Sequence, residues 1–394
     1  MRTQVVIIGA GPSGLMLGQA LAGAGIDAVI LEQRSADYVL SRVRAGVLEQ
    51  GTTDLIERLG AGARMRREGL VHEGFTLAFD GRQHRIDLAD LTGGKSVMVY
   101  GQTEVTRDLM DVRSGSGLAT YYEATDVEVG DFETAPGNGS ARVRFVHGGK
   151  QHEIACDVVA GCDGFHGACR AAVPASAITT YERAFPFGWL GFLVDAPPAA
   201  HELVYAGHER GFALLSMRSA SRWRSYIQVP SEERAENWSL DRFLDEIRRR
   251  LPESIAAEVK AGPVIERTVA PLRSFVAEPM RFGRLFLAGD AAHIVPPTGA
   301  KGLNLAASDI HYLSGALIEW FKEGSRAGID TYSQRALRRI WIAERFSWWM
   351  TTLLHRFPED SRFVDRVKLA ELDYVTASRA AQTMIAENYV GMPY

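Results

Sequence analysis

The sequence predicts an α/β protein with three parts: a Rossmann-like dinucleotide-binding domain on a parallel sheet, an antiparallel-sheet domain and a C-terminal helical region. Three observations lead to this prediction. A glycine fingerprint follows a short apolar run at the N-terminus, β-like runs fill residues 181–269, and aromatic-rich helical segments follow residue 320. With 394 residues and 46% hydrophobic content, the chain is long enough for two or three domains.

Composition limits the classes of function. The chain carries 44 Lys and Arg residues against 48 Asp and Glu residues, so no basic field favours a nucleic acid as partner. Cys156, Cys162 and Cys169 form neither a disulfide framework nor a metal-ligand spacing, which indicates a reducing compartment and no metal site. No window approaches the ~20 apolar residues that span a bilayer. We therefore expect a cytoplasmic protein with no membrane contact.

The N-terminal segment carries the pattern of a dinucleotide-binding fold. Residues 4–8 form an apolar run, as in a strand covered on both faces, and Gly9, Gly11 and Gly14 then match G-x-G-x-x-G. The first glycine permits the tight turn, the second lets a pyrophosphate approach the backbone, and the third lets the helix pack on the strand. A second strand ends at Glu32, where a carboxylate could accept hydrogen bonds from ribose. The fingerprint does not say which dinucleotide binds, and a glycine-rich surface turn is the simpler alternative.

Two later strands end in aspartate. Residues 156–170 run into an Asp-Gly pair at Asp163, and residues 284–290 end in a Gly-Asp pair at Asp290. One glycine fingerprint with these two endings resembles the flavoprotein monooxygenases that hydroxylate aromatic rings, whose DG and GD motifs the endings match. The resemblance implies that the Rossmann-like domain binds FAD and that Asp290 bonds the ribityl chain.

The segment after the GD motif combines stiff and small residues. Pro296 and Pro297 fix the loop without needing backbone donors. Positions 299, 300 and 302 are glycine or alanine, and the resemblance implies that bulk there would collide with the flavin ring. The helix predicted to begin near 302 would point its positive end toward the flavin and stabilise the negative charge of the reduced form.

Stretches along the whole chain resemble the members of this family that hydroxylate 4-hydroxybenzoate. They are SRVRAGVLEQG, GLVHEG, VYGQTEVTRDLM, FGWLGFL, HELVYA, GFALLSMRS, PPTGAKGLNLAASD, ERFSWWM and AENYVG. The resemblance implies hydroxylation at ring position 3 with O2 and NADPH or NADH, through a flavin C4a-hydroperoxide. The product would be 3,4-dihydroxybenzoate, an intermediate of aromatic compound catabolism.

A 4-hydroxybenzoate site needs a planar cation at one wall and a proton acceptor at the other. Ser216 and Arg218 lie two apart on a predicted strand, so their side chains should share a face, and an Arg fork suits a carboxylate. Without the resemblance, a solvated strand face explains the pair better. The resemblance adds Tyr226 as a third contact of the carboxylate.

The resemblance implies four catalytic residues. Tyr205 meets the substrate phenol, Tyr389 hands protons onward, and His72 ends the chain that passes the proton to solvent. A tyrosine titrates near ~10 and is no base by itself, whereas histidine suits a relay near neutral pH. Withdrawing the phenol proton raises electron density ortho to the oxygen and so directs hydroxylation. The carbonyl of Pro297 faces the substrate oxygen, which makes Pro297 and Tyr205 substrate contacts as well.

The resemblance also implies the residues that hold the two nucleotides. For FAD they are Gly9, Gly11, Gly14, Glu32, Arg42, Arg44, Gln102, Asp163, Arg224, Asp290, Leu303 and Asn304. For the NADPH or NADH coenzyme, which has no second Rossmann unit to bind, they are Arg34, Tyr38, Arg42, Arg44, His166 and Arg273. Gln33 and Arg34 stand in the opposite order to that of NADPH-selective members, which leaves the coenzyme preference open.

The predicted FAD-binding domain is discontinuous, because the chain leaves it and returns. The expected boundaries are 1–180 for its first part, 181–269 for the substrate-binding antiparallel sheet, 270–320 for its return segment and 321–394 for the helical region. Trp348 and Trp349 cannot both point inward on one helix, so the helical region is expected to form the interface of a homodimer.

Two other classes of function stay open. The first keeps FAD and changes the chemistry to that of a halogenase, a reductase or a hydroxylase of another phenol. The second is a regulatory dinucleotide-binding module, which would have no use for Tyr205 and Tyr389. Arg218 and Ser216 opposite Tyr205 favour a carboxylated phenol as substrate.

Overall fold

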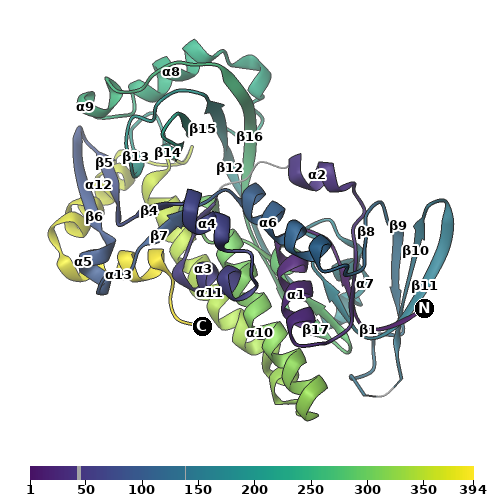
Figure 1. Cartoon of the computed structure of the whole chain (residues 1–394). Coiled ribbons are helices and arrows are strands. Elements are labelled where there is room, and N and C mark those ends of the chain that lie inside the picture. The colour runs from purple at the N-terminus through teal and green to yellow at the C-terminus, as the bar shows by residue number, and fades with distance from the viewer. Residues whose placement is uncertain (42–45, 138) are drawn as a thin grey trace.

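A computed structural model describes residues 1–41, 46–137 and 139–394 (Figure 1). Its first sheet has the order β17-β18-β11-β1-β2-β8, with β10 beside β11 and β9 beside β10. The strands from β18 to β8 are parallel, as the sequence predicts. The bounds are β1 (Arg2–Ile8), β2 (Ala28–Leu31), β8 (Thr120–Tyr121), β9 (Thr125–Gly130), β10 (Ala141–His147), β11 (Lys150–Gly161), β17 (Arg281–Phe282) and β18 (Leu285–Leu287).

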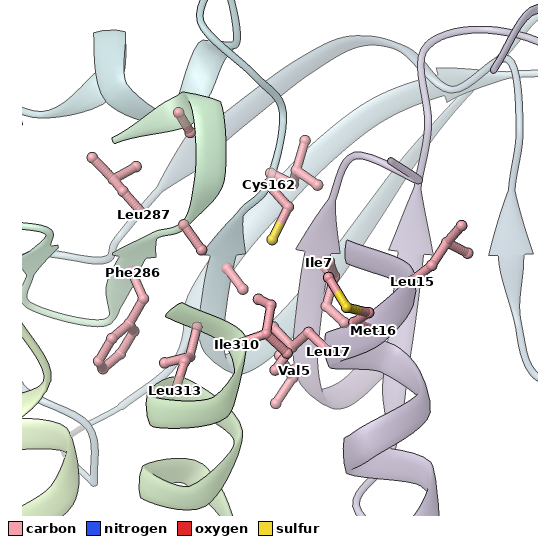
Figure 2. Packing of buried hydrophobic residues seen from close by; sticks show 14 of the residues in the cluster. Val5, Ile7, Leu15, Met16, Leu17, Cys162, Phe286, Leu287, Ile310 and Leu313 are labelled. Atoms are coloured by element: carbon pink, nitrogen blue, oxygen red, sulfur yellow. The ribbon is translucent and has the colours of Figure 1, made fainter. Parts of the chain in front are cut away.

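Helices α1 (Pro12–Gly23) and α10 (Gly302–Glu323) pack against each other and against the parallel sheet. Figure 2 shows Met16 and Leu17 of α1 lying with Ile310 of α10 over Val5 and Ile7 of β1. Each of these five side chains is fully buried. Removing such a side chain from water contributes about 1.5–3 kcal/mol, so this layer holds the two helix N-termini firmly at one edge of the sheet.

The second sheet has the order β19-β16-β12-β15-β14-β13-β5-β6. It is antiparallel except for the pair β13 and β5, which is parallel. The bounds are β5 (Gly74–Phe79), β6 (Arg82–Asp87), β12 (Thr179–Val194), β13 (Leu203–Gly207), β14 (Ala213–Ser219), β15 (Arg222–Pro230), β16 (Val264–Glu278) and β19 (His293–Ile294). From the sequence, this sheet was expected to consist of residues 181–269. It also includes β5 and β6, which come from the chain before residue 180.

The remaining elements connect and cover the two sheets (Figure 1). A small sheet joins β3 (Val47–Leu48), β7 (Val97–Val99) and β4 (Leu70–His72). The shorter helices are α2 (Ala36–Ser41), α3 (Gln50–Arg58), α4 (Ala63–Glu68), α5 (Leu88–Thr92), α6 (Gln102–Gly115), α7 (Ala168–Ala172), α8 (Leu240–Arg248) and α9 (Glu253–Ala256). The 3-10 turns are η1 (Ala175–Ala177), η2 (Ala235–Asn237), η3 (Gly289–Ala291) and η4 (Pro297–Gly299).

The C-terminal region is helical, as predicted. It consists of α11 (Ala327–Leu354), α12 (Arg362–Ala377) and α13 (Arg379–Val390). Trp349 packs against a buried cluster, whereas Trp348 is 48% exposed. The expectation that the two tryptophans cannot both point inward is therefore confirmed. Within the described ranges, no helix is both long enough and apolar enough to cross a membrane.

Candidate active site

The three fingerprint glycines lie where β1 turns into α1. A Cβ on Gly9, whose φ is 105°, would lie 2.2 Å from the carbonyl oxygen of Cys162, and a Cβ on Gly14 would lie 1.9 Å from that of Gly9. A Cβ on Gly11 would meet no atom within 4 Å. Close packing therefore requires the first and third glycines, while the second leaves room at the start of α1. No side chain caps that helix end, so its first backbone N–H groups could bind an anion.

Glu32 lies just beyond β2, beside this helix end. Its carboxylate accepts hydrogen bonds from the backbone N–H groups of Ala10 and Arg34, each at 2.8 Å. A carboxylate has about four lone-pair sites, so two bonds leave capacity for ribose hydroxyls. The backbone bonds fix the carboxylate between the ends of β1 and β2, which the sequence did not predict.

The DG and GD motifs meet at the same edge of the sheet, because β11 and β18 are parallel neighbours. Asp163 accepts from the N–H of Cys169 at 2.9 Å through one oxygen, and its other oxygen has no partner among the described residues. Burial raises the pKa of Asp163. Arg170 ties the motifs together by donating to the carbonyl of Ala291 at 2.7 Å. The sequence analysis missed Arg170, although it stands seven residues after Asp163 in the quoted DG segment.

These observations test whether the site fits FAD. An uncapped helix end, an open approach at Gly11, the fixed carboxylate of Glu32 and the unpaired oxygen of Asp163 offer donors and acceptors for a dinucleotide. Gln102 opens α6, and Leu303 and Asn304 lie in the first turn of α10. Arg42 and Arg44 lie outside the described residues. The groups that are described fit the cofactor.

The GD loop is anchored to α10. Asp309 accepts from the N–H of Gly289 at 2.8 Å and pairs with the His293 ring at 2.6 Å. A Cβ on Gly299 would lie 2.4 Å from Ser347 Oγ of α11, so packing on that helix explains the glycine. A collision with the flavin ring, which the sequence analysis invoked, is not needed there. Ala300 adopts a left-handed φ of 55°, and Gly302 has open space around its Cβ position.

Helix α10 begins at Gly302, as predicted, and no side chain caps its first turn. Asn304, predicted to lie near the flavin, has four protein partners. Its oxygen accepts from the Glu49 N–H at 2.9 Å and from the Thr52 hydroxyl at 2.8 Å. Its amide nitrogen donates to the carbonyls of Val47 and Ala300, each at 2.8 Å. Asn304 therefore links residues 47–52 to the start of α10.

A buried ion network lies beside Asn304 and its partners, and it was not predicted from the sequence. Lys301 donates to Glu49 at 2.6 Å and to the carbonyl of Tyr389 at 3.2 Å, and Glu49 also accepts from Arg339 at 2.7 Å. Burial lowers the pKa of Lys301, and the Glu49 charge opposes that shift. Lys301 stands in the GAKG loop and Glu49 in the GVLEQG stretch, but their separation in sequence hid the pairing.

The two tyrosines predicted to act together are neighbours. The hydroxyls of Tyr205 on β13 and Tyr389 on α13 lie 2.8 Å apart, and both side chains are buried. The Phe75 ring packs against both, with centroid distances of 5.4 Å and 4.5 Å. Burial raises the pKa of Tyr205 to about 12 and that of Tyr389 well above its ordinary value. Both hydroxyls are therefore protonated near neutral pH and can pass a proton along the pair.

The predicted carboxylate contacts come from β14 and β15. A β-bulge between Met217 and Ser219 leaves Arg218 as an extra residue, so simple alternation does not place it on the same face as Ser216. The contacts of Arg218 nevertheless lie on the Ser216 side of the sheet. Its guanidinium contacts the Tyr226 hydroxyl, and Tyr226 shares a face of β15 with Arg224, the residue opposite Ser216. Burial lowers the pKa of Arg218.

Arg224, predicted to be linked with the flavin, is buried on β15 opposite Ser216. Its guanidinium lies 3.3 Å from a Glu266 oxygen, and its carbon lies 5.4 Å from the centre of the Tyr226 ring. One of its nitrogens, Nε, has no partner among the described residues. Arg224 therefore belongs to the wall that carries Ser216 and Tyr226.

His72 differs from the expectation of a relay end at solvent. Its side chain is only 2% exposed, and neither ring nitrogen has a hydrogen-bond partner among the described residues. Burial lowers the pKa of the imidazole. A proton that reaches His72 therefore still has to travel to the surface.

The predicted coenzyme contacts form two surface groups. The Arg34 guanidinium lies 5.1 Å from the centre of the Tyr38 ring. The centre of the His166 ring lies 4.9 Å from that of the Phe165 ring, and the guanidinium carbon of Arg273 lies 4.6 Å from the same Phe165 centre. Arg34 follows Glu32 in the chain, and His166 lies in the DG segment. Arg42 and Arg44, the other two predicted contacts, lie outside the described residues.

Comparisons with known proteins agree with this geometry. Residues 2–347 match the model of a family described as an FAD binding domain. The p-hydroxybenzoate hydroxylase of Acinetobacter baylyi is 58% identical over 394 residues, covering 100% of this chain and 96% of that protein. The 6-hydroxy-3-succinoylpyridine 3-monooxygenase of Pseudomonas putida is 26% identical and is matched over 92% of both chains.

A solved structure shows the same fold. The p-nitrophenol 4-monooxygenase of Pseudomonas putida superposes with a TM-score of 0.80 at 20% identity, with both chains fully covered. At that identity the likeness supports the fold alone. Taken with the family match over residues 2–347 and the relative that is 58% identical over the whole chain, it leads to one conclusion. The chain belongs to the FAD-binding family of flavoprotein monooxygenases.

Proposed function

We propose that this protein is a 4-hydroxybenzoate 3-monooxygenase. It uses FAD, NADPH or NADH, and O2 to convert 4-hydroxybenzoate into 3,4-dihydroxybenzoate. The observation that carries the proposal is the buried tyrosine pair, with hydroxyls 2.8 Å apart. Tyr389 belongs to α13, and Tyr205 lies on the sheet that also carries Arg218 and Tyr226. The 58% identity to a p-hydroxybenzoate hydroxylase supports the same substrate.

In this proposal the carboxylate of the substrate binds Arg218, Ser216 and Tyr226. An Arg fork matches a carboxylate with two parallel hydrogen bonds, and the serine and tyrosine hydroxyls add single donors. Burial of the guanidinium strengthens the interaction, since the surrounding dielectric is low. These contacts orient the ring with its phenol toward Tyr205, and the carbonyl of Pro297 contacts the same end.

The phenol loses its proton through the tyrosine pair. Tyr205 accepts the proton from the substrate as it passes its own to Tyr389, and His72 receives the proton further along. Both tyrosines stay neutral overall, which their raised pKa values favour. The resulting phenolate is richer in electrons at the position ortho to its oxygen. Bound FAD supplies the activated oxygen that this position attacks.

Chain residues hold the cofactor and exclude water. The proposed FAD contacts are Gly9, Gly11, Gly14, Glu32, Arg42, Arg44, Gln102, Asp163, Arg224, Asp290, Leu303 and Asn304. The coenzyme docks at Arg34, Tyr38, Arg42, Arg44, His166 and Arg273, where the guanidinium groups suit phosphates. The exclusion of water matters because it prevents the activated oxygen from being lost as hydrogen peroxide.

The test of the proposal is NADPH and NADH oxidation by the purified yellow protein in air, with and without 4-hydroxybenzoate. We expect strong stimulation by the substrate and formation of 3,4-dihydroxybenzoate, identified by mass and retention time. The ratio of the two coenzyme rates gives the preference that Gln33 and Arg34 leave open. Unstimulated oxidation, or peroxide as the only product, would contradict the assignment and favour another carboxylated phenol as substrate.

The protein is also proposed to be a homodimer through its C-terminal helices. Phe363, Val367 and Tyr374 are 76%, 51% and 59% exposed and lie on one stripe of α12, because their spacings of four and seven residues follow the helical period. Sedimentation velocity should give the mass of two chains for the wild type. Phe363→Glu is expected to give one chain, and Arg362→Glu, on the same turn, should stay dimeric. A monomeric wild type would reject the dimer.

Two further parts of the proposal concern location and organisation. The three cysteines are free and buried, which supports a cytoplasmic location, to be checked by cell fractionation. The chain is divided into domains near residues 180, 269 and 320, with β5 and β6 added to the antiparallel-sheet domain. Residues 180, 269 and 320 lie inside β12, β16 and α10, so limited proteolysis should cut in exposed loops before it cuts at these boundaries.

A further inference from the structure

A cavity lies beside the buried His72. It has a volume of about 520 Å³, and its lining includes Val71 and Glu73, the two chain neighbours of His72. The other charged residues of the lining are Arg85, His201 and Glu202. The relay in the proposed function ends at His72, whose buried side chain is not part of the cavity lining, although both of its chain neighbours are.

The pairing of two strands fixes Glu202 beside His72. Strands β5 and β13 run parallel with Leu203 opposite Phe75, which brings Glu202 level with Gly74, two residues from His72. The same pair of strands carries Tyr205. One end of the pair therefore holds His72 and Glu202, and its middle holds the tyrosine that meets the substrate phenol.

Arg85 clamps the Glu202 carboxylate. Its guanidinium donates to both Glu202 oxygens, at 2.7 Å and 2.9 Å, and to Asp87 at 2.7 Å. A Cβ on Gly74 would lie 2.6 Å from this guanidinium, so a glycine is needed there to leave room for Arg85. The bidentate geometry holds the carboxylate still beside the cavity.

The charges around His72 act in opposite directions. Burial lowers the pKa of its imidazole, the Glu202 carboxylate raises it, and His201 lowers it. Burial raises the pKa of Glu202, but the hydrogen bonds and charge of Arg85 outweigh this and hold that pKa below its ordinary value. Strand β7 presents Val97 opposite His72. The charges that act on the imidazole are therefore those of Glu202 and His201, in the segment before β13, while Arg85 of β6 acts on Glu202.

We propose that Glu202 is a positioning residue of the proton relay, whose clamped carboxylate stabilises protonated His72 where the proton leaves through the cavity. This inference rests on the proposed function, because it takes His72 as the last histidine of the relay. His72 receives a proton from the tyrosine side and gives it to water in the cavity. The imidazole returns to its neutral form, and Glu202 remains ionised throughout.

The direct test follows His72 in the FAD-loaded protein by NMR of labelled histidine, with the signal assigned by its loss in His72→Gln. Glu202→Gln is expected to lower the pKa of His72, and His201→Gln to raise it. Glu73→Gln is the matched control, because Glu73 lines the same cavity without being one of the charges that shift His72. Equal titration of His72 in Glu202→Gln and Glu73→Gln would overturn the proposal.

A kinetic readout separates this role from a structural one. In Glu202→Gln, kcat for hydroxylation should fall about threefold at pH values above the His72 titration, because a weaker base accepts the proton more slowly. The KM for 4-hydroxybenzoate should not change, and Glu202→Asp should restore most of kcat. A rise in KM with an unchanged kcat would contradict the proposal. If the protein hydroxylated a different phenol, the NMR titration would still test the role of Glu202.

Discussion

Replacing Tyr205 by Phe is expected to preserve substrate binding and to lose hydroxylation. The substitution removes the hydroxyl that lies 2.8 Å from that of Tyr389 and leaves the ring and its packing against Phe75. Positioned proton transfer contributes about 10²–10⁴-fold to a rate, so the hydroxylation rate should fall by at least about a hundredfold. The dissociation constant should stay within about threefold, because the carboxylate end supplies most of the binding.

The measurement for Tyr205→Phe is product formed per coenzyme oxidised, together with the dissociation constant from the flavin spectrum. Tyr332→Phe is a matched control, since it also removes a buried hydroxyl, one that donates to the Leu287 carbonyl at 2.8 Å. It should hydroxylate normally, although losing a buried hydrogen bond costs about 1 kcal/mol of stability. Full hydroxylation by Tyr205→Phe would remove the tyrosine pair from the mechanism.

Arg218→Ala is expected to raise the KM for 4-hydroxybenzoate by about a hundredfold or more. Truncating one partner of a buried, hydrogen-bonded charge pair costs about 2–5 kcal/mol, because the other charge is left unpaired. Arg224 is a second cation on the same wall, but its guanidinium already pairs with Glu266, so it is not expected to replace Arg218. A phenol without a carboxylate should bind equally well to the wild type and the variant.

Two controls sharpen the test of Arg218. Arg218→Lys keeps the charge and loses the fork, so its KM should fall between those of the wild type and Arg218→Ala. Arg222 lies on the same hairpin, but its side chain is exposed and pairs with Asp195. The KM of Arg222→Ala should therefore stay near that of the wild type. Equal losses for 4-hydroxybenzoate and for the uncharged phenol, or loss of FAD from Arg218→Ala, would contradict the assignment.

Local chemistry made much of this protein predictable from its sequence. The packing of Gly9 and Gly14 follows from the turn that joins a buried strand to a helix, and the structure bears out both reasons. The parallel sheet and the start of α10 at Gly302 follow in the same way. The juxtaposition of Tyr205 and Tyr389 came from the resemblance to a family, because no local pattern relates residues so far apart.

The features that sequence reasoning missed depend on contacts between distant segments. The Lys301 and Glu49 pair joins two loops that only the folded chain brings together. The bulge at Arg218 depends on how β14 pairs with β15, and the period of a strand does not reveal it. The sequence analysis explained Gly299 by a collision with the flavin ring, whereas its close packing against Ser347 of α11 already requires a glycine.

The parallel pairing of β5 with β13 has a consequence for how this protein is made. It joins residues more than a hundred positions apart, so a long loop must close before the pairing forms. The tyrosine that completes the site lies on α13, which ends at Val390. The hydroxyls of Tyr205 and Tyr389 can therefore meet only after a ribosome has synthesised both residues, 184 positions apart, whereas the glycine fingerprint lies within residues 9–14 and needs no such wait.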